Sequence, residues 1–214
     1  MGAWLAMAVR FLSKRIVLVV LLAAATLGGP LWAQEDSGKE NILPKAPEQL
    51  PQVDSARNLD FLFTALKAAP DEATARSVEA RIWALWLQTP SDTAALLMSR
   101  AKVAADAGNS AVAMELLNAV IRLRPDYTEA FNRRATLSYM KNDYSRALAD
   151  IEQVLIREPR HFAALTGLAL IMEDLGDDKR ALEAYRQALA INPHLERVTE
   201  RVRKLGEKIE GHSL

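Results

Sequence analysis

The chain has 214 residues with 27 basic and 27 acidic side chains, so its formal net charge at neutral pH is zero. Half of the residues are hydrophobic, only 6% are aromatic, and there is no cysteine. The balanced charge argues against nucleic-acid binding, which requires a concentrated basic surface. The lack of cysteine excludes disulfides, thiolate metal sites, a thiol nucleophile and the lipidated cysteine of a bacterial lipoprotein.

Residues 1–33 have the pattern of a secretory signal peptide. Basic residues without any acid precede an apolar run over 16–27, and the small residue Ala33 follows a helix-breaking segment. The apolar run would span about 18 Å as a helix, less than the ~30 Å hydrocarbon core of a bilayer. We expect cleavage after Ala33 and a periplasmic location. An uncleaved anchor stays open, because apolar residues within 7–12 could lengthen the span.

Residues 34–56 are polar and contain three prolines. Such a segment buries too little apolar area to offset the entropy lost on ordering, so we predict a disordered linker. A proline-rich ligand for another domain is the alternative to a simple spacer.

A period of 34 residues organises the chain after the linker. Small residues mark two columns, a closing proline marks a third, and a turn residue lies in the middle of each unit. The columns are Ala101, Ala135 and Ala169; Ala113, Ala147 and Ala181; Pro125, Pro159 and Pro193; and Gly108, Asn142 and Gly176.

These columns predict pairs of antiparallel helices. In the unit 128–161 we expect helices over 130–141 and 145–157. Asn142 and Asp143 tolerate the left-handed backbone of a helix end, and a proline excludes the residue before it from a helix. The alanine columns lie where the two helices approach most closely, and a larger side chain there would force them apart. No alternating strand pattern occurs after residue 33, so we expect no sheet.

The repeat resembles the tetratricopeptide-repeat (TPR) family. Its pattern of a large residue, a small residue, a mid-unit Gly-Asp-Tyr, two alanines and a closing proline is followed over residues 94–193. Departures are Arg100 and Arg134 in place of leucine and Lys179 in place of an aromatic. The best matching unit contains Phe131, Ala135, Asn142, Asp143, Tyr144, Ala147, Val154 and Pro159.

The resemblance implies an all-α solenoid over residues 57–210 with three repeats, 94–127, 128–161 and 162–195. Upstream, 57–90 reads as a degenerate terminal unit with helices over Arg57–Ala68 and Pro70–Gln88, because proline and acidic residues favour a first turn. Downstream, 195–210 has an apolar stripe opposite a charged face and is predicted to be a capping helix.

No pattern of catalytic residues is present, and we predict a non-enzymatic protein without cofactor or metal. His161, His194 and His212 lack a second ligand at helical spacing, which favours structural or solvent-facing roles. Asp177 and Asp178 read as turn residues. Trp83 and Trp86, three residues apart on one helix, could form a recognition platform, although core packing of at least one is the stronger reading.

The resemblance also implies a concave groove, lined by the first helix of each unit, that binds a protein or peptide partner. A clamp for a terminal carboxylate would be incomplete here, so we do not predict one. The groove residues carried over by position are Met98, Lys102, Ala105, Asn132, Arg133, Thr136, Tyr139, Thr166, Leu170 and Glu173.

The leading hypothesis is therefore a scaffold or adaptor of the bacterial cell envelope. It would contact the membrane only if its signal sequence were not cleaved. Two alternatives stay open. One is a self-assembling TPR module, and the other is an accessory subunit that holds a substrate for an envelope enzyme complex, such as that of cytochrome c maturation. The oligomeric state and the partner are left undetermined by the sequence.

Overall fold

The computed structural model describes residues 52–211, and every element within that range is an α-helix, as predicted. The signal-peptide prediction for residues 1–33 lies outside the described residues, as does most of the linker. None of the described helices is both long enough and apolar enough to cross a bilayer. The helices are α1 (Gln52–Lys67), α2 (Glu72–Trp86), α3 (Asp92–Asp106), α4 (Ser110–Leu123), α5 (Thr128–Met140), α6 (Tyr144–Arg157), α7 (Phe162–Asp174), α8 (Asp178–Ile191) and α9 (Glu196–Gly211).

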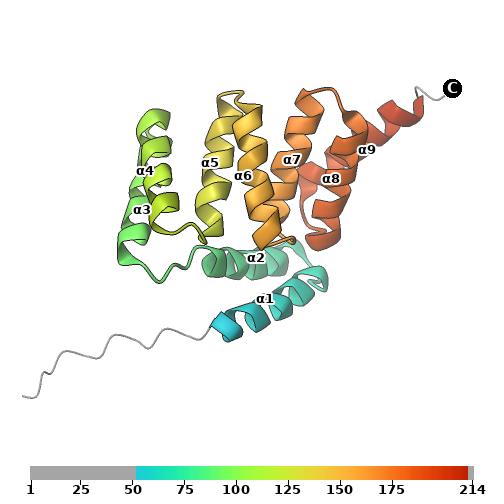
Figure 1. Cartoon of the computed structure of the whole chain (residues 1–214). Helices are drawn as coiled ribbons and strands as arrows, with labels where there is room; N and C mark the ends of the chain where they lie inside the picture. The colour runs from blue at the N-terminus through green and yellow to red at the C-terminus, as the bar shows by residue number, and fades with distance from the viewer. Residues whose placement is uncertain (1–51, 212–214) are drawn as a thin grey trace, which may run out of the picture. The chain divides into compact units, whose positions relative to one another are not determined.

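Helices α3 to α8 form three antiparallel hairpins, α3–α4, α5–α6 and α7–α8 (Figure 1). Each hairpin turns at a residue with left-handed backbone, φ +75° at Gly108, +59° at Asn142 and +79° at Gly176. This confirms the role predicted for the mid-unit column. The next residue caps the second helix by accepting a hydrogen bond from the backbone N–H three residues on, and these caps are Asn109, Asp143 and Asp177.

The alanine columns lie inside the hairpins, where the two helices meet. Each of the six alanines is at most 3% exposed, so none has room for a larger side chain without displacing a helix. The six are Ala101, Ala113, Ala135, Ala147, Ala169 and Ala181.

Two further columns bury the first helix of each unit against the unit before it. Ala130 and Leu137 of α5 belong to the core of the α3–α4 hairpin. Ala164 and Ile171 of α7 belong in the same way to the core of the α5–α6 hairpin. Helix α9 repeats the arrangement on α7 and α8 through Val198 and Leu205. The C-terminal helix thus occupies the place of a first helix in a fourth unit, which fits the predicted cap.

Arg134, where the resembling family has leucine, is part of a polar network that joins three helices. Its Nε and Nη2 atoms donate to the Asp150 carboxylate at 2.8 and 2.7 Å, and its Nη1 atom donates to Asn118 Oδ1 at 2.8 Å. The Asp150 side chain is 4% exposed. A charge this deeply buried needs such partners, so the arginine and the aspartate stabilise the structure only together.

The first two helices differ from their predicted bounds. Helix α1 begins at Gln52, inside the segment 34–56 that was predicted to be disordered, because no proline follows Pro51 to interrupt a helix. Helix α2 begins after Asp71, whose carboxylate accepts a hydrogen bond from the Thr74 N–H and caps the helix. Pro70 therefore precedes the helix instead of starting it.

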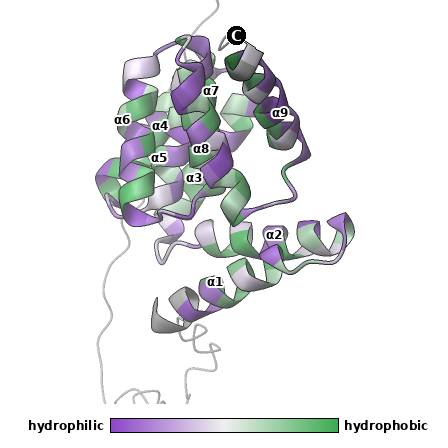
Figure 2. Cartoon of the chain, turned by 90° about the vertical axis from the view of Figure 1, so that its right-hand side faces the viewer, coloured by the Kyte–Doolittle hydropathy of each residue, from purple (hydrophilic) through white to green (hydrophobic). Residues whose placement is uncertain are grey.

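The α1–α2 hairpin is not stacked on α3 as a terminal unit of the solenoid would be. Helix α2 runs across the N-terminal ends of α5, α7 and α9, and α1 packs beneath it (Figures 1 and 2). At one end, the Tyr127 hydroxyl at the start of α5 donates to the Leu87 carbonyl at 2.8 Å. Farther along, Asn192 before α9 donates to Glu79 at 3.0 Å. The expectation of an in-line terminal unit is corrected by these contacts.

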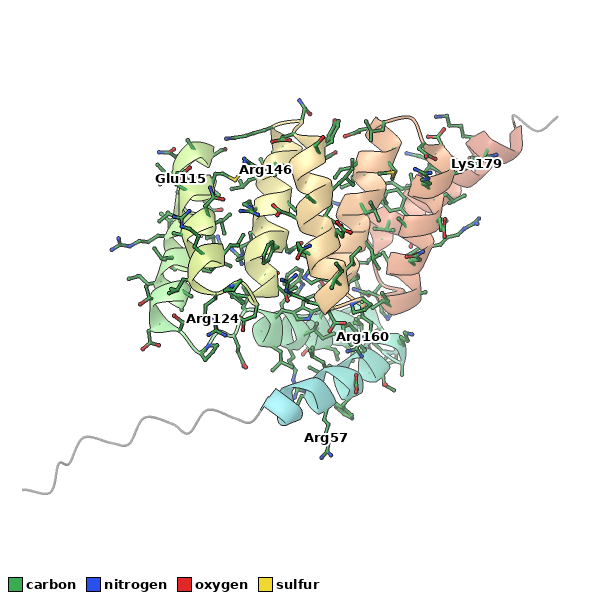
Figure 3. The ribbon with its side chains drawn as sticks, viewed as in Figure 1. Arg57, Glu115, Arg124, Arg146, Arg160 and Lys179 are labelled. Atoms are coloured by element: carbon green, nitrogen blue, oxygen red, sulfur yellow. The ribbon has the colours of Figure 1, made fainter. Side chains whose placement is uncertain are left out.

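The two tryptophans of α2 form the centre of this contact, which confirms core packing over a recognition platform. The Trp86 ring stacks on the His161 ring with centroids 4.1 Å apart and an interplanar angle of 10°. Trp83 meets the Trp86 and Phe162 rings edge-on at 5.1 and 6.0 Å. On the α1 side, the Arg160 guanidinium lies over the Phe63 ring at 4.4 Å, below α6 in Figure 3.

Candidate peptide groove

The first helices α3, α5 and α7 follow one another in register, and α5 contacts α7 directly. A 34-residue repeat places equivalent residues of these helices on one face, which is the candidate groove. The structure places Lys102 on α3, Asn132 to Tyr139 on α5, and Thr166 to Glu173 on α7. Met98 is 6% exposed in the core of the first hairpin, so its side chain is largely hidden from a ligand.

Asn132 and Arg133 are held by a buried carboxylate at the start of α5. Glu129 is 2% exposed and accepts hydrogen bonds from Asn132 Nδ2 at 3.0 Å and Arg133 Nε at 3.2 Å. The carboxylate compensates the Arg133 charge, and the two side chains are fixed instead of free to reorganise. Sequence reasoning missed Glu129, although an acidic residue in a first turn is a recognisable signal.

His161 connects this carboxylate to the α1–α2 hairpin. Its Nδ1 atom accepts the Ala164 backbone N–H at 3.2 Å and so caps α7. A neutral imidazole with an accepting Nδ1 carries its proton on Nε2, which faces Glu129 Oε2 at 3.4 Å. The ring is fully buried and stacked on Trp86. The structural role predicted for this histidine is therefore confirmed.

The middle of the face carries little charge. Thr136 and Thr166 donate their hydroxyls to carbonyls of their own helices, those of Asn132 at 3.1 Å and Phe162 at 2.8 Å. Thr136 is exposed on this face, and Thr166 and Leu170 are half-buried. This combination offers apolar contact and a few hydrogen-bonding groups, which suits the side chains of an uncharged peptide segment.

The far end of the face is polar and tied to α9. Glu173 accepts hydrogen bonds from the Tyr185 hydroxyl at 2.9 Å and from Arg201 Nη1 at 2.6 Å. Burial and this carboxylate raise the pKa of Tyr185, so its hydroxyl stays protonated and donating. Nearby, burial and Asp174 raise the pKa of Tyr139. These contacts hold α7 and α9 together at the end of the face.

An open hollow of about 860 Å³ lies between α7 and α9 and extends the face beyond the residues predicted from the sequence. Its α9 side includes Glu200, Arg201 and Lys204. These residues are one repeat after Thr166, Gly167 and Leu170, so applying the 34-residue step once more would have found them. Among the residues that the structure describes, no group of three His, Cys, Asp or Glu side chains is placed to hold a metal ion.

The paired hairpins define the chain as an α-solenoid whose first helices follow one another. A family model described as tetratricopeptide repeat matches residues 98–149 and 132–196. A TPR repeat-containing protein of Rhizobium etli is 39% identical over 156 residues, which are 73% of this chain and 76% of the relative. The chain belongs to the tetratricopeptide-repeat family.

Solved structures show the same fold. The Sgt2 TPR domain from Aspergillus fumigatus is 20% identical with a TM-score of 0.54, over 58% of this chain and 84% of that one. The first TPR domain of Spaghetti, solved bound to the HSP90 peptide SRMEEVD, is 16% identical with a TM-score of 0.54, over 57% of this chain and 97% of that one. At these identities the likeness concerns the fold alone.

Proposed function

We propose that this protein is a non-enzymatic scaffold that binds a segment of a partner protein along the face formed by α3, α5, α7 and α9. The observation that carries the proposal is the weakly charged centre at Thr136, Thr166 and Leu170 between polar ends. The Spaghetti domain, which shares the fold, is bound to a peptide in its structure, and this supports a peptide ligand for the present chain.

The distribution of charge along the face indicates the kind of segment that fits. Lys102 lies on α3 at one end, while Asp174 and the Glu173–Arg201 pair lie at the other. An extended or helical segment with apolar side chains at its centre would bury them against Leu170 and the neighbouring threonines, whose hydroxyls are bonded to their own helices. Each contact is weak, and affinity comes from several units acting on one segment.

We place the protein in the periplasm as an envelope adaptor because residues 1–33 have the pattern of a signal peptide. Cleavage after Ala33 gives a mature chain that starts at Gln34. N-terminal sequencing of the protein recovered from a periplasmic fraction tests this directly. A chain that starts before residue 33 and sediments with the membrane would replace cleavage by an uncleaved anchor, and a cytosolic chain would overturn the envelope role.

The groove is tested by site-specific photo-crosslinking in the cells that make the protein. A photoreactive amino acid replaces Thr136 on α5, and the matched control replaces Glu152, an exposed residue on the second helix α6. The proposal predicts a discrete crosslinked partner from position 136, lost when Leu170 is changed to Glu, and none from position 152. Equal capture from both positions, or capture that survives Leu170→Glu, would contradict it.

A further inference from the structure

Helix α3, the first helix of the array, carries exposed apolar residues at repeat positions that are buried between units elsewhere in the array. Leu96 and Val103 of α3 are 54% and 65% exposed. They stand 34 residues before Ala130 and Leu137, which are 0% and 6% exposed against the preceding hairpin. At the two later steps the same columns are buried again, at Ala164 and Ile171 and at Val198 and Leu205. Among the residues that the structure describes, 52–211, no helix covers these positions in the first unit.

Arg100 lies between the two apolar residues on the same face of α3, and it indicates the charge of the missing helix. Its equivalent one repeat later, Arg134, bonds Asp150 within its own hairpin and Asn118 on the hairpin before it. In the first hairpin, Leu116 stands in the place of that aspartate. Arg100 has no ion pair or side-chain hydrogen bond with any residue that the structure describes. Arg100 is exposed, so its guanidinium is free to pair with an acidic side chain of a helix that docks on this face.

Three occupants can be compared on these grounds. A second copy docked face to face would bring Arg100 against Arg100, because this residue lies at the centre of that face of α3, and like charges repel. A second copy docked head to tail would present α9, whose Arg203 is paired with Glu200 and Glu207 on a charged surface. The third candidate is the chain's own α2. Its residue at the repeat position of Asn118 is Ala84, which offers Arg100 no acidic group. Helix α2 is also held at another place, where Trp86 stacks on His161.

We propose that this face of α3 docks an amphipathic α-helix of another protein, one with an apolar stripe and an Asp or Glu that pairs with Arg100. The helix would lie as α4 lies on α5, in the position of the absent preceding unit. This surface is separate from the groove and needs neither its ligand nor its geometry.

The probe is a synthetic peptide with the α4 sequence, residues 110–123, stapled through positions 111 and 115 on its exposed side. One version carries Asn118→Asp and the other Asn118→Lys. Fluorescence anisotropy with the full protein should show the acidic peptide binding about fivefold tighter than the basic one, as expected for an exposed charge pair. In the Arg100→Glu protein the order should reverse, and Leu96→Asp should remove binding of both. Val112→Asp, at an exposed apolar residue of α4, is the matched control and should change neither.

Each other outcome overturns the proposal. If both peptides bound equally well to the wild type and to Arg100→Glu, Arg100 would not pair with the docked helix. If binding survived Leu96→Asp, the peptide would bind at a different surface. A dimer by sedimentation that Leu96→Asp dissolves would make a second copy the occupant. A disulfide that forms within one chain between Ala84→Cys and Val103→Cys would make the occupant the α1–α2 hairpin. Circular dichroism establishes that each variant is folded.

Discussion

The α3–α8 array and the α1–α2 hairpin are both built from antiparallel helices, but different contacts hold them. In the array, small and medium residues recur at fixed spacing, so every unit buries the next with the same columns, such as Ala130 and Leu137. The hairpin is held by single large side chains, above all the Trp86–His161 stack, which no other unit repeats. A periodic interface is visible in a sequence, whereas one made of unique contacts is visible only in the structure.

The largest effect expected on the array side comes from Arg134→Ala. The change leaves the buried Asp150 carboxylate without its bidentate partner, and an unpaired buried charge costs about 3 kcal/mol of unfolding free energy. Urea denaturation followed by circular dichroism measures the loss. The matched control is Arg100→Ala, an exposed residue at the same repeat position, which should change stability by less than about 0.5 kcal/mol. Equal losses from both variants would show that the buried network is unimportant.

On the hairpin side, Trp86→Ala should cost about 2 kcal/mol, because it removes a large, partly buried ring from the contact with His161 and Phe162. The loss should be local. Hydrogen exchange should become fast in α1 and α2 while the amides of α5 to α8 stay protected. Protection lost throughout the chain would mean that hairpin and array fold as a single cooperative unit, and would remove the distinction between them.

A smaller effect is expected from one of the hydrogen bonds that join the two regions. Tyr127→Phe removes the donor to the Leu87 carbonyl and should cost about 1 kcal/mol by urea denaturation. Burial raises the pKa of Tyr127 to about 12. A raised pKa in the folded state gives stability that is complete below the ordinary value near 10 and is lost as pH rises through 12. The phenylalanine variant should lack this alkaline loss, and an unchanged alkaline profile would contradict the assignment.

The smallest effect concerns the charged surface of α9. Hydrogen bonds from Arg203 and Lys204 lower the pKa of Glu200 to about 2. The stabilising contribution of a carboxyl with a lowered pKa is present above its ordinary pKa and disappears as pH falls through the folded value. An NMR titration of Glu200 should therefore give an acid midpoint well below the ordinary glutamate range, and Arg203→Ala should move it upward. A midpoint unaffected by that change would show that the pair is not formed in solution.

The sequence was sufficient for the array because backbone turns and close approaches demand particular residues. Gly108, Asn142 and Gly176 have positive φ, and the alanine columns are buried as the period predicted. It was insufficient for the placement of α1–α2, which depends on contacts between residues distant along the chain, above all the stack of Trp86 on His161. The groove residues predicted from the sequence were also incomplete, because some contributions depend on the fold. Glu129 acts from inside the fold, and the contribution of α9 required one further repeat step.

The central claim is that the array binds the partner segment and that the hairpin only braces the helices that form the groove. It is tested most directly by measuring how much partner crosslinks from position 136 in two variants, Leu170→Glu in the groove and Trp86→Ala in the hairpin. We predict that Leu170→Glu abolishes the crosslink and that Trp86→Ala retains it at temperatures where the array is folded. Loss of the crosslink in Trp86→Ala and its retention in Leu170→Glu would contradict the claim.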